Sequence, residues 1–247
     1  VGNMIIADDL NNRIRKVDVN TGVVTTIAGS GRSDFSGDGM LAIVASLNSP
    51  QSVTIDTNGN IFIADTNNNR VRKIDANTNI ITTIAGNGIA SFDGDNGVAS
   101  NASLDTPTSV AVDKQGNILI ADSGNNRIRR VDAITNIITT VVGNGRSDFS
   151  GDGGPALQAS LSFPIGIFLD EKNNLLIADS FNNRIRKVDS STGNITSIAG
   201  TGDADYNGDN ILATRASLNF PSFATMDSLG NIFISDTDNS RVRKIDV

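Results

Sequence analysis

The 247-residue sequence contains no cysteine and no histidine. The absence of cysteine excludes disulfide bonds, thiolate nucleophiles and cysteine-ligated zinc or iron–sulfur sites. The absence of histidine removes the most common general base and the most common transition-metal ligand. Tryptophan is also missing and there is a single tyrosine, so any stacking platform for sugars or bases has to come from the ten phenylalanines.

Basic residues are outnumbered by acidic ones, and the formal net charge is −7. This balance disfavours binding to phosphate backbones, so the sequence predicts no nucleic-acid partner. No apolar run reaches the roughly 18 residues of a membrane-spanning helix, and no membrane insertion is predicted. The segment also lacks the charged-then-apolar pattern of a signal peptide. Its length and its 38% hydrophobic content suit a single large all-β domain over residues 1–247.

One phrase occurs five times along the chain. It reads GNMIIADDLNNRIRK from Gly2, and it returns as GNIFIADTNNNRVRK from Gly59, GNILIADSGNNRIRR from Gly116, NNLLIADSFNNRIRK from Asn173 and GNIFISDTDNSRVRK from Gly230. Each copy starts 57 residues after the one before. A spacing held without insertion indicates one structural unit copied several times. A catalytic site is seldom built in five copies, so the phrase favours architecture over chemistry.

The repeat between Pro50 and Pro107 predicts four short strands at 52–56, 60–65, 70–75 and 79–86. Turns of three to five residues, rich in Asn and Gly, separate them, so neighbouring strands are expected to form antiparallel hairpins. The fourth strand is followed by a longer connection. Its apolar positions, which predict one or two short helical turns, are Ala99, Ala102 and Leu104.

The second strand of this repeat is apolar on both faces, because Phe62 and Ala64 point opposite to Ile61 and Ile63. Four antiparallel strands covered on both faces, repeated in tandem, are typical of propeller blades. A β-helix has shorter repeats, a (β/α) barrel needs a helix after each strand, and a two-sheet sandwich exposes one face of each strand. The sequence therefore predicts an all-β fold, a β-propeller of four-stranded antiparallel blades.

The pattern P…GIFLD…NNLLIADSFNNRIRKVD resembles the NHL repeat of β-propellers, and the resemblance covers the whole chain. The segments GDGGPALQASL and TTIAG resemble the long-repeat NHL variety that is common in secreted bacterial proteins and is found in teneurin propellers. The resemblance implies an NHL-type propeller with about 4.5 to 5 blades in this chain. It also implies a bacterial protein in an extracellular or periplasmic location. NHL propellers include sensors, RNA binders, scaffolds and a few enzymes, so the motif is specific for fold rather than function.

The aspartate that closes the second strand and the first arginine of the third strand are five residues apart in every copy. A hairpin turn brings them close, and we expect the arginine to bind the aspartate and neighbouring carbonyls, as the NHL resemblance also implies. These predicted structural latches are Asp8 with Arg13, Asp65 with Arg70, Asp122 with Arg127, Asp179 with Arg184 and Asp236 with Arg241. The alternative is a ring of charges that faces a ligand, but persistence in all five copies favours structure.

A second arginine follows two residues after each first arginine. These second arginines are expected at solvated or interblade edges, and they are Arg15, Arg72, Arg129, Arg186 and Arg243.

The long connection carries an Asp- and Gly-rich segment, which reads SDFSGDG at Ser33 and again at Ser147. Carboxylates beside sharp glycine bends can bind calcium, and the candidates in the same register are Asp38, Asp95, Asp152 and Asp209. Each loop offers one or two carboxylates and no Glu, so a cap or a bend is the alternative role. The aromatic residues of these segments are expected to anchor each loop to its blade, and they are Phe35, Phe92, Phe149 and Tyr206.

These residues predict a non-enzymatic binding or scaffold propeller that contacts a protein partner or another copy of itself. No cofactor is expected, and calcium is the one alternative to that expectation. The alternatives are a metal-dependent hydrolase that resembles gluconolactonase, and an amplified structural repeat without a ligand. The first strands offer no nucleophile–base pair, since their alternating candidates are Ser52/Thr54, Ser109/Ala111, Gly166/Phe168 and Phe223/Thr225.

Residues that differ between the copies of the repeat can discriminate between these functions. Clustering of copy-specific residues on one rim would indicate a site, and the residues concerned are Phe163, Phe181, Phe220, Arg215 and Tyr206. The second and third strands occur five times but the first and fourth only four times, which gives 18 strands. Because this is not a multiple of four, we expect the chain to be a segment of a longer protein or to complete its blades by assembly.

Overall fold

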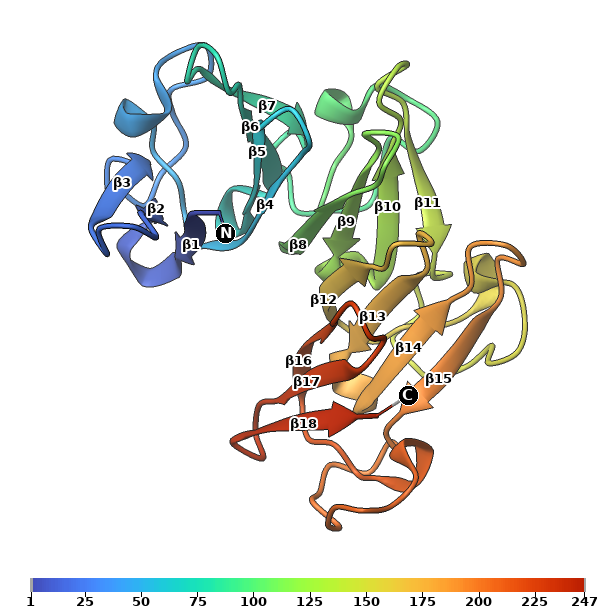
Figure 1. The fold of residues 1–247 in the computed structure, drawn as a ribbon. Coiled ribbons are helices and arrows are strands. Elements are labelled where there is room, and N and C mark those ends of the chain that lie inside the picture. Colours follow the sequence, from blue (N-terminus) through green and yellow to red (C-terminus); the bar gives the residue numbers. More distant parts are fainter. Residues whose placement is uncertain (1, 247) are drawn as a thin grey trace. The chain divides into compact units, whose positions relative to one another are not determined.

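The computed structural model describes residues 2–246, and this part of the chain forms eighteen β-strands and eight short 3-10 helices. The strands make five antiparallel sheets that follow one another along the chain (Figure 1). Three sheets contain four strands, and the first and last contain three. These sheets are the five blades of an all-β propeller, and the predicted fold class and strand number are confirmed.

The strands take the following bounds. Blade 1 contains β1 (Met4–Asp8), β2 (Arg13–Val17) and β3 (Val24–Ala28). Blade 2 contains β4 (Pro50–Ile55), β5 (Ile61–Asp65), β6 (Arg70–Ile74) and β7 (Ile81–Ala85). Blade 3 contains β8 (Pro107–Val112), β9 (Ile118–Asp122), β10 (Arg127–Val131) and β11 (Ile138–Val142). Blade 4 contains β12 (Pro164–Leu169), β13 (Leu175–Asp179), β14 (Arg184–Val188) and β15 (Ile195–Ala199). Blade 5 contains β16 (Pro221–Met226), β17 (Ile232–Asp236) and β18 (Arg241–Ile245).

The 3-10 helices lie at two recurring places. Four occupy turns within blades, namely η1 (Asp9–Asn11), η3 (Thr66–Asn68), η5 (Ser123–Asn125) and η7 (Ser180–Asn182). The other four lie in the long loops 29–49, 86–106, 143–163 and 200–220, and they are η2 (Ala42–Val44), η4 (Ala99–Asn101), η6 (Ala156–Gln158) and η8 (Ala213–Arg215). The helical turn expected in the long connection is therefore confirmed.

The residues group into two compact units, one formed by 1–120 with 130–139 and the other by 121–129 with 140–247. We describe each unit by itself. That residues 1–247 form a single propeller or propeller segment stays a prediction. No helix of the described chain is long and apolar enough to cross a membrane.

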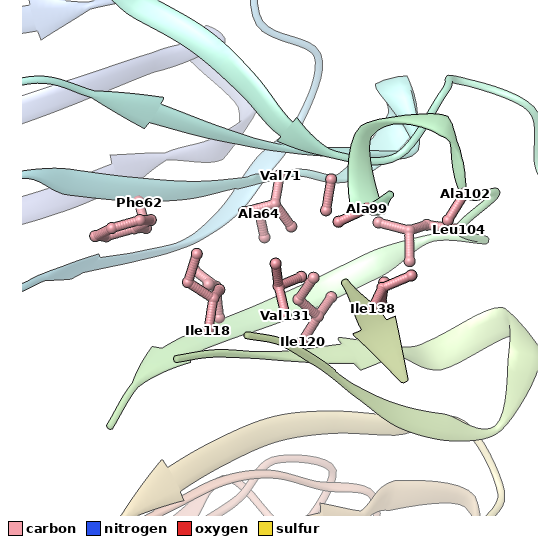
Figure 2. Packing of buried hydrophobic residues seen from close by; sticks show 12 residues of the cluster. Phe62, Ala64, Val71, Ala99, Ala102, Leu104, Ile118, Ile120, Val131 and Ile138 are labelled. Carbon is pink, nitrogen blue, oxygen red and sulfur yellow. The ribbon is translucent and has the colours of Figure 1, made fainter. Parts of the chain in front are cut away.

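In the first unit, adjacent blades share apolar cores. Side chains of β5 and β6, including Phe62, Ala64 and Val71, face Ile118 and Ile120 of β9 (Figure 2). The long loop contributes to the same cluster through Ala99, Ala102 and Leu104, which are fully buried. Burial of both faces of β5 confirms the expectation from its apolar pattern and stabilises the blade through the removal of apolar surface from water.

In the second unit, an equivalent cluster joins blades 4 and 5. Leu176, Ala178 and Ile185 of blade 4 pack with Ala224 and Ile234 of blade 5. Leu218, from the end of the long loop, is buried in the same cluster. The loops 29–49, 86–106 and 200–220 therefore supply apolar side chains to the cores between the blades that they connect.

Gly86 marks a close approach between a long loop and the turn that precedes β6. Its φ is +90°, and a Cβ atom there would collide with the Asn69 carbonyl oxygen and lie 2.9 Å from the Arg70 Cα. Gly39 has a similar φ of +79° with nothing within 4 Å of its Cβ position. The two glycines share a left-handed backbone but differ in whether an added Cβ atom would meet other atoms. Comparing substitutions at the two positions therefore separates the cost of the backbone conformation from the cost of the steric clash.

We predict that Gly86→Ala destabilises the protein more than Gly39→Ala does. Both substitutions place a side chain on a left-handed backbone, at a cost of about 1–2 kcal/mol. Gly86→Ala adds an overpacking cost of about 1–3 kcal/mol, because the opposing atoms belong to backbone. Chemical denaturation of the two variants measures the difference, and equal losses of unfolding free energy would refute this packing.

Candidate functional site

Blades 2 to 5 each carry a buried aspartate at the end of the second strand, and blade 2 shows its contacts most fully. The side chain of Asp65 is completely buried. Its Oδ1 accepts from the Asn48 backbone N–H at 2.8 Å, and its Oδ2 accepts from the Asn68 side chain at 2.9 Å. The guanidinium of Arg72, which is also fully buried, donates to the same Oδ2 at 3.2 Å. Four groups thus meet in one dry cluster.

The ion-pair partner predicted from the sequence was wrong. Asp65 and Arg70 lie directly opposite in the β5–β6 register, yet Arg70 donates to the backbone carbonyls of Asn68 and Asn87 at 3.0 and 2.7 Å. Arg72, the second arginine, forms the ion pair with Asp65 instead. Its side chain points into the buried space, whereas Arg70 is partly exposed.

The same pairing with the second arginine recurs in every blade. The ion pairs are Arg15–Asp8 at 3.2 Å, Arg72–Asp65 at 3.2 Å, Arg129–Asp122 at 3.1 Å, Arg186–Asp179 at 3.2 Å and Arg243–Asp236 at 3.6 Å. The second arginines were expected at solvated or interblade edges, and the solvated alternative is wrong for those of blades 2, 3 and 4, which are completely buried. The first arginines were also expected to bind neighbouring carbonyls. Each of them does donate to a backbone carbonyl, and they are Arg13, Arg70, Arg127, Arg184 and Arg241.

The second arginine of blade 2 also reaches into the long loop of the preceding repeat. Arg72 donates to Asp38 Oδ1 at 2.8 Å and to the carbonyls of Ser36 and Ser46 at 3.2 and 3.4 Å. Arg186 has the same arrangement with its own preceding loop, where Asp152 lies 2.7 Å away. Charge-assisted bonds of this kind are among the stronger hydrogen bonds in proteins. One arginine therefore fastens its own blade to the loop of the repeat before it.

Burial raises the pKa of the Asp65 and Asp179 carboxyl groups above the ordinary value, because the charged form loses its hydration. Hydrogen bonds from backbone and side-chain donors and the nearby arginines oppose this shift in both carboxyl groups. The two carboxyl groups sit in a structural setting that is repeated along the chain. Their perturbed pKa values therefore do not by themselves identify a catalytic centre.

The long loop lies along the outer strand of the following blade. Gly39 N–H donates to the Ile81 carbonyl at 2.9 Å, and Ile81 N–H donates back to the Met40 carbonyl at 2.9 Å. The ring of Phe35 lies over the Arg70 guanidinium, 3.8 Å from its carbon. The loop aromatics Phe149 and Tyr206 take the same position over Arg184 and Arg241. They anchor the loop to the following blade, not to their own as the sequence had suggested.

The calcium candidates are distributed one to a loop. Asp38, Asp152 and Asp209 each form an ion pair with a second arginine, at 2.8, 2.7 and 3.0 Å. Asp95 lies at the equivalent position of the second long loop. Among the described residues no group of three or more acidic side chains is placed to hold a metal ion. Calcium binding stays a prediction, and any ion would compete with an arginine for these carboxylates.

Three phenylalanines of the second unit break the symmetry of the repeats. The rings of Phe163 and Phe181 stack with their centroids 5.1 Å apart, and the ring of Phe220 is tilted by 45° against that of Phe181 with the centroids 5.5 Å apart. We call these three residues the aromatic cluster. The sequence analysis predicted that a site would bring copy-specific residues together. Phe163, Phe181 and Phe220 do lie together. Tyr206 lies over Arg241 instead, and Arg215 is an exposed residue of η8.

The backbone holds the aromatic cluster in place. Phe163 and Phe220 have φ of 47° and 51°, values that are uncommon for residues with large side chains. Their N–H groups donate to the side chains of Asn126 and Asn183 at 2.8 and 2.9 Å. Phe181 lies in η7 and donates to the Ser162 carbonyl at 3.1 Å. Backbone hydrogen bonds thus hold the three phenylalanines in place.

The other copies carry different residues at these places. Ser49 and Thr106 stand where Phe163 and Phe220 do, and the Phe181 position holds Leu10, Asn67, Gly124 and Asp238. Phe181 is 57% exposed although it contacts two rings. An apolar side chain with this exposure is not needed for the core, so the aromatic cluster is the candidate site.

Comparison with known proteins supports the repeat assignment. The family model described as NHL repeat matches residues 47–74, 104–131 and 218–245. The chain is an NHL-repeat protein. NHL repeat-containing protein 2 of Homo sapiens is 27% identical over 272 residues, which cover 98% of this chain and 37% of that protein. Teneurin-1 of Homo sapiens is 28% identical over 85% of this chain and 8% of its own length. The NHL chain therefore spans less than half the length of either relative.

Solved structures share the fold. An auxiliary nutrient binding protein from Bacteroides thetaiotaomicron superposes with a TM-score of 0.69 at 21% identity, over 99% of this chain and 56% of its own. A catalytically inactive virginiamycin B lyase from Staphylococcus aureus, solved with quinupristin, superposes with a TM-score of 0.55 at 17% identity, over 98% and 66%. At such identities the likeness concerns the fold alone.

We predict that Asp65→Asn lowers the free energy of unfolding by about 3–5 kcal/mol, because it leaves the buried Arg72 charge without its partner. Asp8→Asn is the matched control. Asp8 and Arg15 are 25% and 31% exposed, so solvent screens their pair and the loss should stay below about 1 kcal/mol. Urea denaturation of both variants measures the two losses. Equal losses would show that burial of the pair does not set its importance.

Proposed function

We propose that this chain is a non-enzymatic binding module that docks a protein partner on the aromatic cluster. The observation that carries the proposal is the contact of Phe181 with the rings of Phe163 and Phe220, on a framework whose other copies lack these rings. Repeats normally vary where they bind and stay constant where they pack. At the aromatic cluster the repeats differ in sequence, and the differing residues are in contact with one another.

The chemistry of the rings favours a protein partner over a carbohydrate. Phenylalanine carries no hydrogen-bonding group, and the aromatic cluster offers flat apolar surface with 57% of Phe181 exposed. Aromatic anchors with apolar surroundings typically dominate the binding energy of protein interfaces. The expected partner presents an extended segment with one apolar side chain that inserts against Phe181. Sugar sites, in contrast, need polar groups that hydrogen-bond to ring hydroxyls.

Several observations favour binding over catalysis. The sequence contains no histidine or cysteine, and the described residues contain no cluster of three acidic groups. The virginiamycin B lyase whose structure resembles this fold is called catalytically inactive when one histidine is replaced by alanine. This NHL chain has no histidine with which to perform such a step. A metal-dependent hydrolase and an amplified repeat without a ligand remain the alternatives.

The proposal includes an extracellular or periplasmic location in a bacterium. Its support is the resemblance of the long loops to secreted NHL proteins and the fold shared with two auxiliary nutrient binding proteins from Bacteroides. The proposal involves neither nucleic acid nor membrane insertion, because the net charge is −7 and no described helix could span a bilayer.

We predict that peptides selected on this protein from a random phage-displayed library bind the aromatic cluster. Phe181→Ser should weaken a selected peptide at least tenfold in isothermal titration calorimetry, because truncating a central aromatic anchor removes most of its contact. Phe92→Ser is the matched control. Phe92 is a 42% exposed phenylalanine of the first unit, and its substitution should leave the affinity unchanged.

Circular dichroism and thermal unfolding establish that Phe181→Ser folds, as expected for a substitution at an exposed position. Enrichment of apolar peptides that lose affinity in Phe181→Ser, but not in Phe92→Ser, supports the proposal. Failure to enrich any peptide overturns it. Equal affinity of the selected peptides for Phe181→Ser and the unaltered protein also overturns it, because binding would then lie elsewhere.

A further inference from the structure

A groove of about 690 Å³ lies between blades 4 and 5 of the second unit. One wall comes from the end of β12 and the turn 170–174, and the other from the end of β16 and the turn 227–230. Figure 1 shows β12 and β13 beside β16. Both hairpins lie entirely within the described residues. The volume falls within the range of about 300–1,000 Å³ that is usual for small-molecule sites.

In blade 2 one residue from each of the first three strands forms a row across one face of the sheet. Thr54 lies opposite Phe62, and Phe62 lies opposite Lys73. The Lys73 ammonium is 5.9 Å from the centre of the Phe62 ring, which is buried in the core that blade 2 shares with blade 3 (Figure 2). The ring therefore fills space between blades and gives the lysine a cation–π partner. Blade 5 repeats this row as Thr225, Phe233 and Lys244.

Blade 4 carries a different row beside the groove. Phe168 lies opposite Leu176, and Leu176 lies opposite Lys187. The ring thus stands on the first strand instead of the second, and the smaller leucine takes the buried place in the core. Phe168 and Lys187 both line the groove. In blade 4 the groove therefore adjoins a lysine that has no ring opposite it.

The ammonium of Lys187 has no partner in the part of the chain that the structure describes. It forms neither an ion pair nor a ring contact there, whereas the equivalent Arg130 of blade 3 pairs with Asp132 at 3.5 Å. Lys187 is partly buried. An ammonium in this position gives up part of its hydration without a bond in return. A ligand that brings a negatively charged acceptor would form a charge-assisted hydrogen bond with it.

Acidic residues also line the groove, but their carboxylates already accept hydrogen bonds. Asp227 Oδ1 accepts from the N–H groups of Leu229 and Asn231 at 3.0 and 2.9 Å, and its Oδ2 accepts from the Asn231 side chain at 2.8 Å. Asp170 has the equivalent bonds in its own turn, and Glu171 is not without a partner either. A ligand can therefore newly satisfy the lysine rather than the acids. The acidic charge still disfavours a ligand with more than one negative charge.

The remaining surface of the groove is apolar. Phe168, Met226 and Ile232 line it and pack against the core between blades 4 and 5. Leu229 also lines it and is 79% exposed. The residues at the position of Leu229 in the other copies are polar, and they are Asn58, Gln115 and Lys172. The groove thus combines apolar surface with one lysine that lacks a partner.

We propose that this groove binds a small amphipathic monocarboxylate, with the carboxylate at Lys187 and the apolar chain along Phe168 and Met226. Lys172 lines the same groove and adds a second positive charge. The apolar chain supplies affinity through the removal of its surface from water, and Lys187 supplies selectivity for the anion. This small-molecule site is separate from the aromatic cluster, and it does not rest on the proposed protein partner.

The test uses octanoate as the probe in isothermal titration calorimetry at pH 7, below the concentration at which micelles form. We expect saturable binding of one octanoate per protein chain. Octyltrimethylammonium has the same chain with the opposite charge, and it should show no saturable binding. Lys187 would repel its head group, and the nearby carboxylates are already engaged in their turns.

Protein variants locate the site. Lys187→Gln should weaken octanoate at least tenfold, because the charge that holds the carboxylate is lost. Lys73→Gln is the matched control, since it removes the equivalent lysine of blade 2 and should leave the affinity unchanged. The double variant Phe168→Thr/Leu176→Phe copies the row of blade 2 into blade 4. It should also weaken octanoate at least tenfold, because the new ring fills space beside Lys187.

Circular dichroism and thermal unfolding establish that each variant folds, and the double variant is expected to fold because its row already exists in blades 2 and 5. Binding that is lost in Lys187→Gln and in the double variant, but kept in Lys73→Gln, supports the inference. Absence of saturable octanoate binding overturns it. Equal or tighter binding of octyltrimethylammonium, or equal octanoate affinity in Lys187→Gln, overturns it as well.

Discussion

The buried second arginine is the constraint on which the rest of this structure depends. Arg72 and Arg186 each neutralise an aspartate of their own blade and reach an aspartate and two carbonyls in the long loop before it. A charge buried in this way needs all of these partners, because an unpaired guanidinium in the interior is strongly unfavourable. The loop therefore has to return to the following blade whenever that blade folds. This requirement explains why aspartate, arginine and loop recur together at a fixed period.

The same requirement makes stability a property of neighbouring repeats. Long loops carry apolar residues into the cores between blades, and in blades 2, 3 and 4 the backbone of the preceding loop pairs with the outer strand. Repeat proteins of this kind are stabilised by contacts between adjacent units more than by long-range ones. Within the described residues β18 is the last strand of blade 5, and Arg243 is 10% exposed there while its counterparts in blades 2 to 4 are fully buried. The aromatic cluster is a local departure from this repeated design.

Much of the fold was predictable because a 57-residue period repeats each sequence pattern five times. Alternating apolar residues located the strands within one or two positions, and the two apolar faces of residues 60–65 indicated a strand buried on both sides. The ion-pair partner was not predictable from spacing. Asp65 lies opposite Arg70 in the hairpin, and the loop of the preceding repeat, about thirty residues away, decides that Arg72 is buried instead.

The candidate site was only partly predictable for a similar reason. Comparison of the copies singled out Phe163, Phe181 and Phe220 as unusual, but Tyr206 and Arg215 were equally unusual and lie elsewhere. Which of them meet depends on a left-handed backbone at Phe163 and Phe220 and on its bonds to asparagine side chains.

The central claim is that the second arginine holds the long loop on the following blade. Hydrogen exchange of Arg72→Lys tests it most directly, because lysine keeps the charge but loses the planar fork that reaches several acceptors. The account predicts faster exchange at the Gly39 and Ile81 amides, with unchanged exchange at Gly153 and Ile195, where Arg186 is intact. Equal acceleration in both loops would indicate general destabilisation, and no acceleration at Gly39 would show that the loop is held by other contacts; either result would contradict the account.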